Sequence, residues 1–239
     1  MIRVILFDFD HTLYDRRAVY HNMIGVYREH FGDELPENLS DAELADALAD
    51  ADLDAIYPDG SWDEILDLST ARGIFRHRPE TKPYYDFIRP HFPAAIRLQD
   101  DILPTLRTLR ERGYRLGVLT NGFTDYQYAK LNATPIPAYM DIIRVSREFG
   151  DSKPSPRPFL GMCRLFDCPA EEMVYVGDSP VNDVCGARGA GLIPVWLRNR
   201  PVFAPYAAPA PYTIDRMGEL PAVIEQIERD LAGKAAERE

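Results

Sequence analysis

Two acidic residues close a short apolar run near the start of the chain. The run Val4-Ile5-Leu6-Phe7 is followed by Asp8 and Asp10, which lie two residues apart. Side chains at this spacing on a strand point the same way, so the two carboxylates would repel each other unless a cation or a shared proton lay between them. Helix capping explains one aspartate after a strand but explains a pair poorly. The pair therefore predicts a chemical site.

A second acidic group follows another apolar run. Asp178 and Asp183 come after Met173-Val174-Tyr175-Val176. Asp183 also suits the first turn of a helix, where a negative charge is favoured by the helix dipole, and this is its structural alternative. Two strand ends that bear several carboxylates indicate a hard-cation site, and Mg²⁺ prefers such oxygen ligands.

Two further segments offer what a phosphate group needs. Thr120, Asn121 and Gly122 follow an apolar run and supply a hydroxyl, an amide and a flexible backbone whose N–H groups can face an anion. Lys153, next to Pro154, supplies a point charge that suits phosphate. A threonine after a strand is usually a packing residue and a surface lysine is usually solvated, so only their combination predicts a phosphate site.

Alternating strand and helix patterns must position these residues. Buried strands are predicted at 4–7, 116–119, 142–143, 173–176 and 193–196, and helices at 102–112, 159–166, 181–188 and 217–231. Apolar runs without polar alternation are typical of parallel strands covered on both faces. The pattern predicts an α/β fold, a doubly wound parallel-sheet (Rossmann-like) core whose strand ends meet at one crevice.

Residues 16–97 break this alternation with helix after helix. Capping boxes start at Ser40 and Ser61. Residues that end helices or lie in the connections between them are Gly32, Pro58, Gly73 and Pro79. We interpret 16–97 as an inserted all-α domain, with 1–15 and 98–232 as the core and 233–239 as a flexible tail. Pro201–Pro211 is predicted to be a loop. The alternative is a set of ordinary crossover helices, although one crossover rarely needs four.

Composition limits the partners. The 239 residues include 38 acidic and 27 basic side chains, a net charge of -11, which disfavours binding to nucleic acid polymers or anionic lipid. No apolar run approaches the ~20 residues of a membrane helix, and no export signal is recognisable. The three cysteines fit no zinc or redox spacing. We expect a cytoplasmic protein with reduced thiols, no membrane partner, and a monomeric or homodimeric state.

Taken in order, these segments resemble the four signature motifs of the haloacid dehalogenase-like (HAD) hydrolase superfamily. The matching residues are Asp8-x-Asp10-x-Thr12, Thr120, Lys153-Pro154 and Gly177-Asp178-Ser179-x-x-Asn182-Asp183. The segment from Lys153 to Phe159 is similar to that of the subfamily with a helical cap inserted after the first motif. The predicted insert falls where that cap would be.

The resemblance implies a role for each matched residue. Asp8 would attack phosphorus and form an aspartyl-phosphate, while Asp10 would protonate the leaving oxygen and then deprotonate the attacking water. Thr120 and Lys153 would hold the phosphate oxygens, together with Asn121 and Gly122. The family's Mg²⁺ would be bound by Asp8, the backbone carbonyl of Asp10, and Asp178, with Asp183 as a further ligand or a neighbour of the ligands. The substrate would be a small phosphorylated metabolite.

Several activities of the superfamily stay open. Asp10 and the second acidic group favour a phosphatase over a dehalogenase, which needs neither an acid nor a metal. A phosphonatase would need a cap lysine, and Lys82, the only lysine of the insert, is placed too late. A phosphohexomutase is not excluded by the core motifs. A non-catalytic phospho-acceptor or an inactive scaffold fits less well. Thr12-Leu13-Tyr14-Asp15 resembles nucleotidases, so the phosphatase is expected to be of nucleotidase or sugar-phosphate type.

The insert contains residues that could contact a substrate, and a basic stretch runs from Arg72 to Lys82. The polar and aromatic candidates are Arg17, Tyr20, Arg72, Arg76, His77, Arg78, Tyr84 and Tyr85. A solvated helix face is the favoured interpretation of the basic stretch, and an anionic docking surface is the alternative. His11 stands where the family commonly has glycine; we favour a loop role for it over a mechanistic one.

Overall fold

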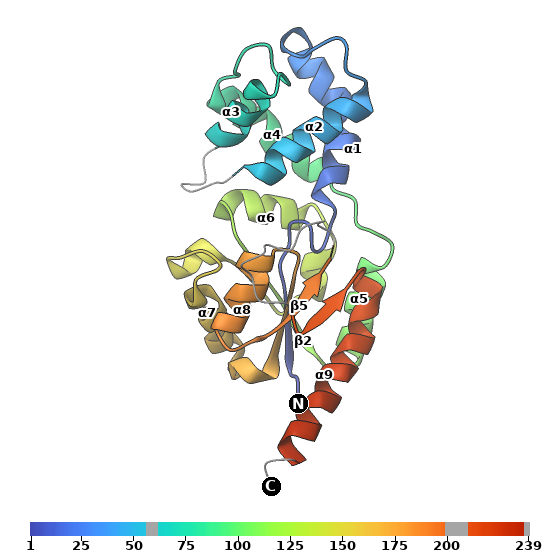
Figure 1. Ribbon diagram of the computed structural model, residues 1–239, viewed down its shortest axis with the longest axis vertical. Helices are drawn as coiled ribbons and strands as arrows, with labels where there is room; N and C mark the ends of the chain where they lie inside the picture. The colour runs from blue at the N-terminus through green and yellow to red at the C-terminus, as the bar shows by residue number, and fades with distance from the viewer. Residues whose placement is uncertain (56–61, 199–209, 237–239) are drawn as a thin grey trace. The chain divides into compact units, whose positions relative to one another are not determined.

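Six parallel strands form a single sheet in the order β3-β2-β1-β4-β5-β6 (Figure 1). The computed structural model describes residues 1–55, 62–198 and 210–236. The strands are β1 (Val4–Phe7), β2 (Arg115–Thr120), β3 (Ile142–Val145), β4 (Met173–Gly177), β5 (Ile193–Leu197) and β6 (Tyr212–Ile214). All five neighbouring pairs are parallel, which confirms the predicted doubly wound sheet.

The register brings the chemical residues to one edge. Phe7, the last residue of β1, pairs with Val118 of β2 and with Val176 of β4. The pairing continues by one residue, since the Asp8 N–H donates to the Val176 carbonyl over 2.9 Å. All four side chains of β1 are buried, as expected for a central strand covered on both faces. The ends of β1, β2 and β4 therefore meet at the same rim.

Helices cover both faces of the sheet, with α5 and α9 on one side and α7 and α8 on the other (Figure 1). Their bounds are α5 (Ile102–Glu111), α7 (Pro156–Phe166), α8 (Gly186–Gly189) and α9 (Leu220–Ala236). Side chains of α7, including Phe159, Met162 and Phe166, pack against Leu6 and Tyr175 of the sheet.

The core differs from the sequence prediction in five elements. α7 begins at Pro156 because Ser155 caps it, and the helix predicted at 181–188 is a π-helical turn, Pro180–Cys185, followed by α8. The predicted 217–231 helix begins with a 3₁₀ turn, Met217–Glu219, before α9. The edge strand β6 and the helix α6 (Thr124–Asn132) were not predicted.

The described residues form two compact units: residues 15–97 with 128–134, and the remainder. The first is helical, with α1 (Arg16–Phe31), α2 (Asp41–Asp54), α3 (Asp63–Ala71) and α4 (Thr81–Ala95). The capping box at Ser40 is confirmed, because Ser40 and Glu43 exchange side-chain and backbone hydrogen bonds. α1 ends before Gly32, and Gly73 adopts a left-handed conformation (φ +72°) after α3. Ser61, Pro58, residues 237–239 of the predicted tail, and most of the Pro201–Pro211 loop lie outside the described residues.

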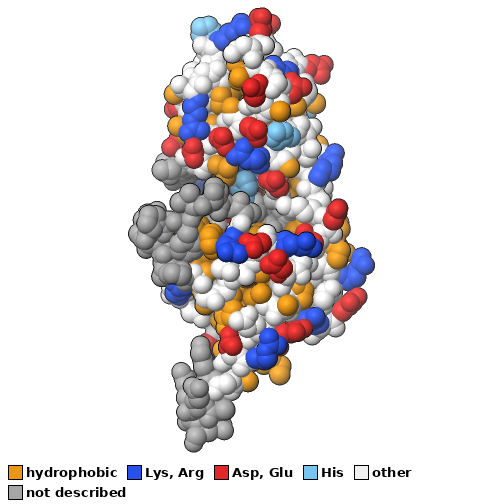
Figure 2. Space-filling model, turned by 45° about the vertical axis from the view of Figure 1, so that its right-hand side comes forward, with side chains coloured by type: hydrophobic (Ala, Val, Ile, Leu, Met, Phe, Trp, Pro, Cys, Tyr) orange, Lys and Arg blue, Asp and Glu red, His pale blue; other side chains and the backbone are white. Residues whose placement is uncertain are grey.

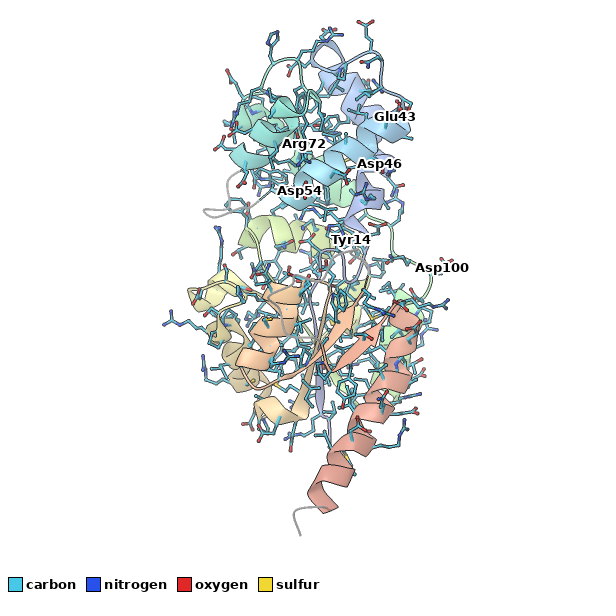
Figure 3. All side chains as sticks on the ribbon, viewed as in Figure 1. Tyr14, Glu43, Asp46, Asp54, Arg72 and Asp100 are labelled. Atoms are coloured by element: carbon cyan, nitrogen blue, oxygen red, sulfur yellow. The ribbon has the colours of Figure 1, made fainter. Side chains whose placement is uncertain are left out.

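Many basic side chains of the helical unit form ion pairs. Arg72, near the end of α3, contacts Asp54 of α2 over 2.7 Å (Figure 3). The space-filling view shows acidic and basic side chains interspersed on the visible face of this unit (Figure 2). Further pairs in this unit include Arg17 with Asp46 and Asp50, Arg76 with Glu37, Arg78 with Asp63 and Asp67, and Lys82 with Asp86. This pairing favours a solvated helix face for the basic stretch at Arg72–Lys82.

Two of the aromatic candidates in the insert are core residues. Tyr20 and Tyr84 are each 1% exposed. Tyr20 packs edge-on against Phe92, and Tyr84 packs against Tyr27 and Phe31. Their burial within the helical unit accounts for their presence in the sequence without a substrate.

Candidate active site

Three buried carboxylates meet at the rim of the sheet. Asp8 follows β1, Asp178 follows β4, and Asp183 lies in the π-helical turn after β4. One oxygen from each lies within 4.8 Å of the others, and the three residues are 7%, 1% and 1% exposed, respectively. Like charges this close and this buried repel strongly unless cations lie among them.

Lys153 supplies one of the needed positive charges. Its ammonium donates to Asp8 Oδ1, Asp183 Oδ1 and the Tyr175 hydroxyl, each over 2.7 Å. The Tyr175 hydroxyl in turn donates to the Leu119 carbonyl over 2.7 Å, which fixes the phenol between β4 and β2. Lys153 therefore joins the first and last motifs of the sequence in one buried network.

The electrostatics of this network follow from burial and charge. Burial raises the pKa of Asp8 to about 6; the Lys153 charge opposes this rise and the Asp183 charge adds to it. For Lys153, burial acts to lower the pKa, but the charges of Asp183 and Asp8 outweigh it and raise the pKa above the usual value. Burial, with the nearby charges of Asp183 and Asp8, raises the pKa of Tyr175 far above its usual value. The lysine is thus cationic and the tyrosine neutral at physiological pH.

Asp183 is oriented by its own loop. Its Oδ2 accepts the Ser179 N–H over 2.9 Å, while Oδ1 accepts from Lys153. Gly177 makes this approach possible, because a Cβ at that position would lie 2.4 Å from Asp183 Cγ. The backbone of the neighbouring Asp178 is held as well, because the Trp196 indole of β5 donates to its carbonyl over 2.8 Å. Trp196 was predicted only as a strand residue, and nothing in its spacing signals this contact.

Asn121 holds the backbone of the lysine loop. Its Nδ2 donates to the Lys153 carbonyl and its Oδ1 accepts the Lys153 N–H, each over 2.9 Å. The sequence suggested a phosphate contact for this amide, whereas in the structure both of its polar ends bond to Lys153. Gly122, beside it, has φ +131°, a conformation that side chains rarely adopt.

Asp10 stands apart from the three clustered carboxylates. It is partly exposed, its Oδ1 accepts from the Tyr14 hydroxyl, and its Oδ2 accepts from Gln127 Nε2 over 2.8 Å. Gln127 Nε2 also lies 3.0 Å from Thr120 Oγ1. Gln127 was not predicted, because it lies on α6, whose sequence lacks an apolar stripe.

His11, the next residue, has φ +60°. In this left-handed region glycine is favoured and histidine is tolerated. The backbone conformation therefore suits glycine and accepts the histidine found here.

The donor set fits a divalent cation. Asp8, Asp178 and Asp183 bring three negative charges to one point, and Lys153 offsets one of them. Hard carboxylate oxygens are the ligands that Mg²⁺ prefers. The excess of two negative charges and the hard oxygen ligands both match Mg²⁺.

Comparison with known proteins identifies the family. The profile described as "Haloacid dehalogenase-like hydrolase" matches residues 5–196. The chain therefore belongs to the haloacid dehalogenase-like hydrolases. Its described residues contain no helix with the length and apolar character needed to cross a membrane.

Relatives with assigned names include several phosphatases. A glyceraldehyde 3-phosphate phosphatase of Methanopyrus kandleri is 28% identical, over 96% of this chain and 100% of that one. A human N-acylneuraminate-9-phosphatase is 32% identical over 70% of this chain and 67% of its own length. A phosphoserine phosphatase of Thermus thermophilus is 40% identical, but over only 38% of this chain and 37% of its own.

Solved structures share the fold. The HAD-hydrolase YfnB of Bacillus subtilis, crystallised with magnesium, superposes with a TM-score of 0.74 at 23% identity, over 93% of this chain and 98% of that one. The L-2-haloacid dehalogenase of Xanthobacter autotrophicus gives a TM-score of 0.72 at 16% identity, over 94% and 99%. At these identities the likeness establishes the fold alone.

Proposed function

We propose that this hydrolase is a Mg²⁺-dependent phosphatase of small phosphate monoesters that works through an aspartyl-phosphate on Asp8. The observation that best supports it is the buried group of Asp8, Asp178 and Asp183 with Lys153 between two of them. Such a site suits a phosphoryl group, which brings its own negative charge and needs cations to approach an anionic nucleophile. Named relatives that act on phosphate esters support the same substrate class.

In the first step, an oxygen of the Asp8 carboxylate attacks phosphorus in line with the ester bond. The P–O bond to the leaving group breaks as the bond to Asp8 forms, and the Asp10 carboxyl proton passes to the departing oxygen, which leaves as an alcohol. Lys153 and the Thr120 hydroxyl hold the phosphoryl oxygens during this displacement.

In the second step, water attacks the phosphorus of the aspartyl-phosphate. Asp10, now a carboxylate, takes the proton of the water, the bond from phosphorus to Asp8 breaks, and inorganic phosphate leaves. Both groups return to their starting forms. One carboxyl group thus serves as acid and then as base, because the first step produces the form that the second step needs.

Mg²⁺ would be held by Asp8, Asp178 and the backbone carbonyl of Asp10, with Asp183 beside them, and it would neutralise charge on the phosphate oxygens. By the resemblance, the helical unit formed mainly by residues 15–97 would be the cap of the subfamily. We propose substrates of nucleotide or sugar-phosphate type.

Asp10 is the residue that separates this proposal from dehalogenation. A halide leaves without a proton, so a dehalogenase has no use for an acid at this position. The fold likeness to dehalogenases is compatible with both activities, since the two share one architecture.

The proposal is tested with purified chain on p-nitrophenyl phosphate and a panel of phosphorylated metabolites. We expect phosphate release that stops with EDTA and returns with Mg²⁺. Asp8→Asn should abolish it, and an exposed control, Asp33→Asn, should leave it unchanged. Release that persists in EDTA, or in Asp8→Asn at the wild-type rate, would refute the mechanism.

A further inference from the structure

Asp10 is held through both of its carboxylate oxygens by buried donors. The Tyr14 hydroxyl donates to Oδ1, and Gln127 Nε2 donates to Oδ2 over 2.8 Å. Tyr14 is fully buried and Gln127 is 2% exposed, whereas Asp10 is partly exposed. One donor lies in the loop after β1 and the other on α6, so two different elements hydrogen-bond to the Asp10 carboxylate.

Both donors are themselves fixed. The Tyr14 ring packs against Phe9 with centroids 4.9 Å apart. The Gln127 side chain packs against Gly122, where an added Cβ would lie 2.9 Å from Nε2. The same amide lies 3.0 Å from Thr120 Oγ1. Gln127 Nε2 also donates to the Asn121 carbonyl, so both donors have further contacts beside Asp10, and in the structure they hold its carboxylate in one orientation.

We propose that Gln127 and Tyr14 are positioning residues that aim the Asp10 carboxyl at the oxygen of the leaving group. The inference rests on the proposed function, in which Asp10 gives its proton to that oxygen. Proton transfer needs donor and acceptor within hydrogen-bond reach, so a carboxyl free to rotate is a weaker acid catalyst. Both contacts also suit the carboxylate that remains on Asp10 once the proton has gone, because hydrogen bonds to an ionised group are the strong ones.

Gln127 has a rival role that predicts a different result. Through Thr120 it could act on phosphate binding instead of on the leaving group. A defect in phosphate binding weakens the reaction of every ester alike. A misoriented acid lowers the rate for esters with basic leaving groups and leaves the rate unchanged for those whose leaving group departs without a proton.

The test therefore compares kcat/KM for phenyl phosphate and p-nitrophenyl phosphate, which differ little in shape but strongly in the basicity of the leaving group. We expect Gln127→Leu and Tyr14→Phe to lower kcat/KM for phenyl phosphate about tenfold or more beyond any loss on p-nitrophenyl phosphate, within the range of general acid catalysis. Tyr27→Phe, which removes a hydroxyl from a buried tyrosine of the helical unit, is the matched control and should leave the ratio unchanged.

The outcomes are distinct. Equal losses on both esters, or no loss in either variant, would overturn the positioning role. Tyr14→Phe keeps the buried ring, so it decides the question even if Gln127→Leu does not fold. A wild-type chain inactive on both esters in Mg²⁺ would overturn the proposed function itself, a result easily told from an unchanged ratio.

Discussion

Replacing Lys153 by methionine removes the positive charge from the carboxylate group while keeping the length of the side chain. Lys153 is 5% exposed and donates to Asp8 and Asp183 over 2.7 Å each. Removing one partner of a buried ion pair costs about 3–5 kcal/mol of folding free energy, because the other partner stays buried and uncompensated. In the absence of divalent cations, we expect Lys153→Met to lose folding free energy of this size. In the activity assay, we expect its turnover to fall about 10²-fold or more.

The size of the loss should depend on pH. Burial already raises the pKa of Asp8 to about 6 with Lys153 present, and without Lys153 it would rise further. A group whose pKa is raised by folding contributes stability that is complete below its unfolded pKa and is lost as the pH rises through the folded pKa. Lys153→Met should therefore destabilise the protein more at about pH 8 than at about pH 5, where Asp8 can take up a proton.

Urea denaturation of both proteins in EDTA at the two pH values measures this difference. Lys82→Met is the matched control, since Lys82 has an 84% exposed side chain paired with Asp86, and such pairs contribute at most about 1 kcal/mol. Wild-type stability in Lys153→Met, or a loss that is the same at both pH values, would refute the electrostatic reasoning.

Two further predictions concern the same carboxylates. Gly177→Ala should lower kcat about tenfold or more, because the added Cβ would displace Asp183. Steady-state kinetics measure this effect. The control Gly25→Ala, whose added Cβ would have no atom within 4 Å, should change kcat little. Mg²⁺ affinity should fall about tenfold for each unit of pH below about 6, where a proton on Asp8 competes with the ion, and level off above it. Calorimetric titration showing equal affinity at about pH 5 and pH 7 would contradict that competition.

The fold was largely predictable because the central strands are continuous apolar runs. β1, β2, β4 and β5 are buried on both faces, so their sequences need no alternation to be recognised. β6 has only three residues at the edge of the sheet, which is too short to give a pattern. The π-helical turn at Pro180–Cys185 was read as α-helix, because both have the same apolar spacing until the Ser179 carbonyl accepts the N–H groups of both Asp183 and Val184.

The site was predictable where charge itself is the signal. Buried charges are costly, so carboxylates that follow strands and a lysine in a neighbouring loop point to chemistry. The structure brings Asp8, Asp178, Asp183 and Lys153 together. Neutral amides give no such signal. The roles of Gln127 and Asn121 depend on which side chains and backbone groups lie opposite their amides, and this is decided by tertiary packing.

The central place of β1 also has a consequence for biosynthesis. Residues 4–7 leave the ribosome first among the strands, yet their partners at 115–118 and 173–176 are made much later. Contacts so distant in sequence slow folding and leave apolar segments exposed meanwhile. The helices between β1 and β2 contact segments that are nearer in the sequence. We therefore expect the helical portion of the nascent chain to fold early, whereas β1 can pair on both sides only after β4 has been synthesised.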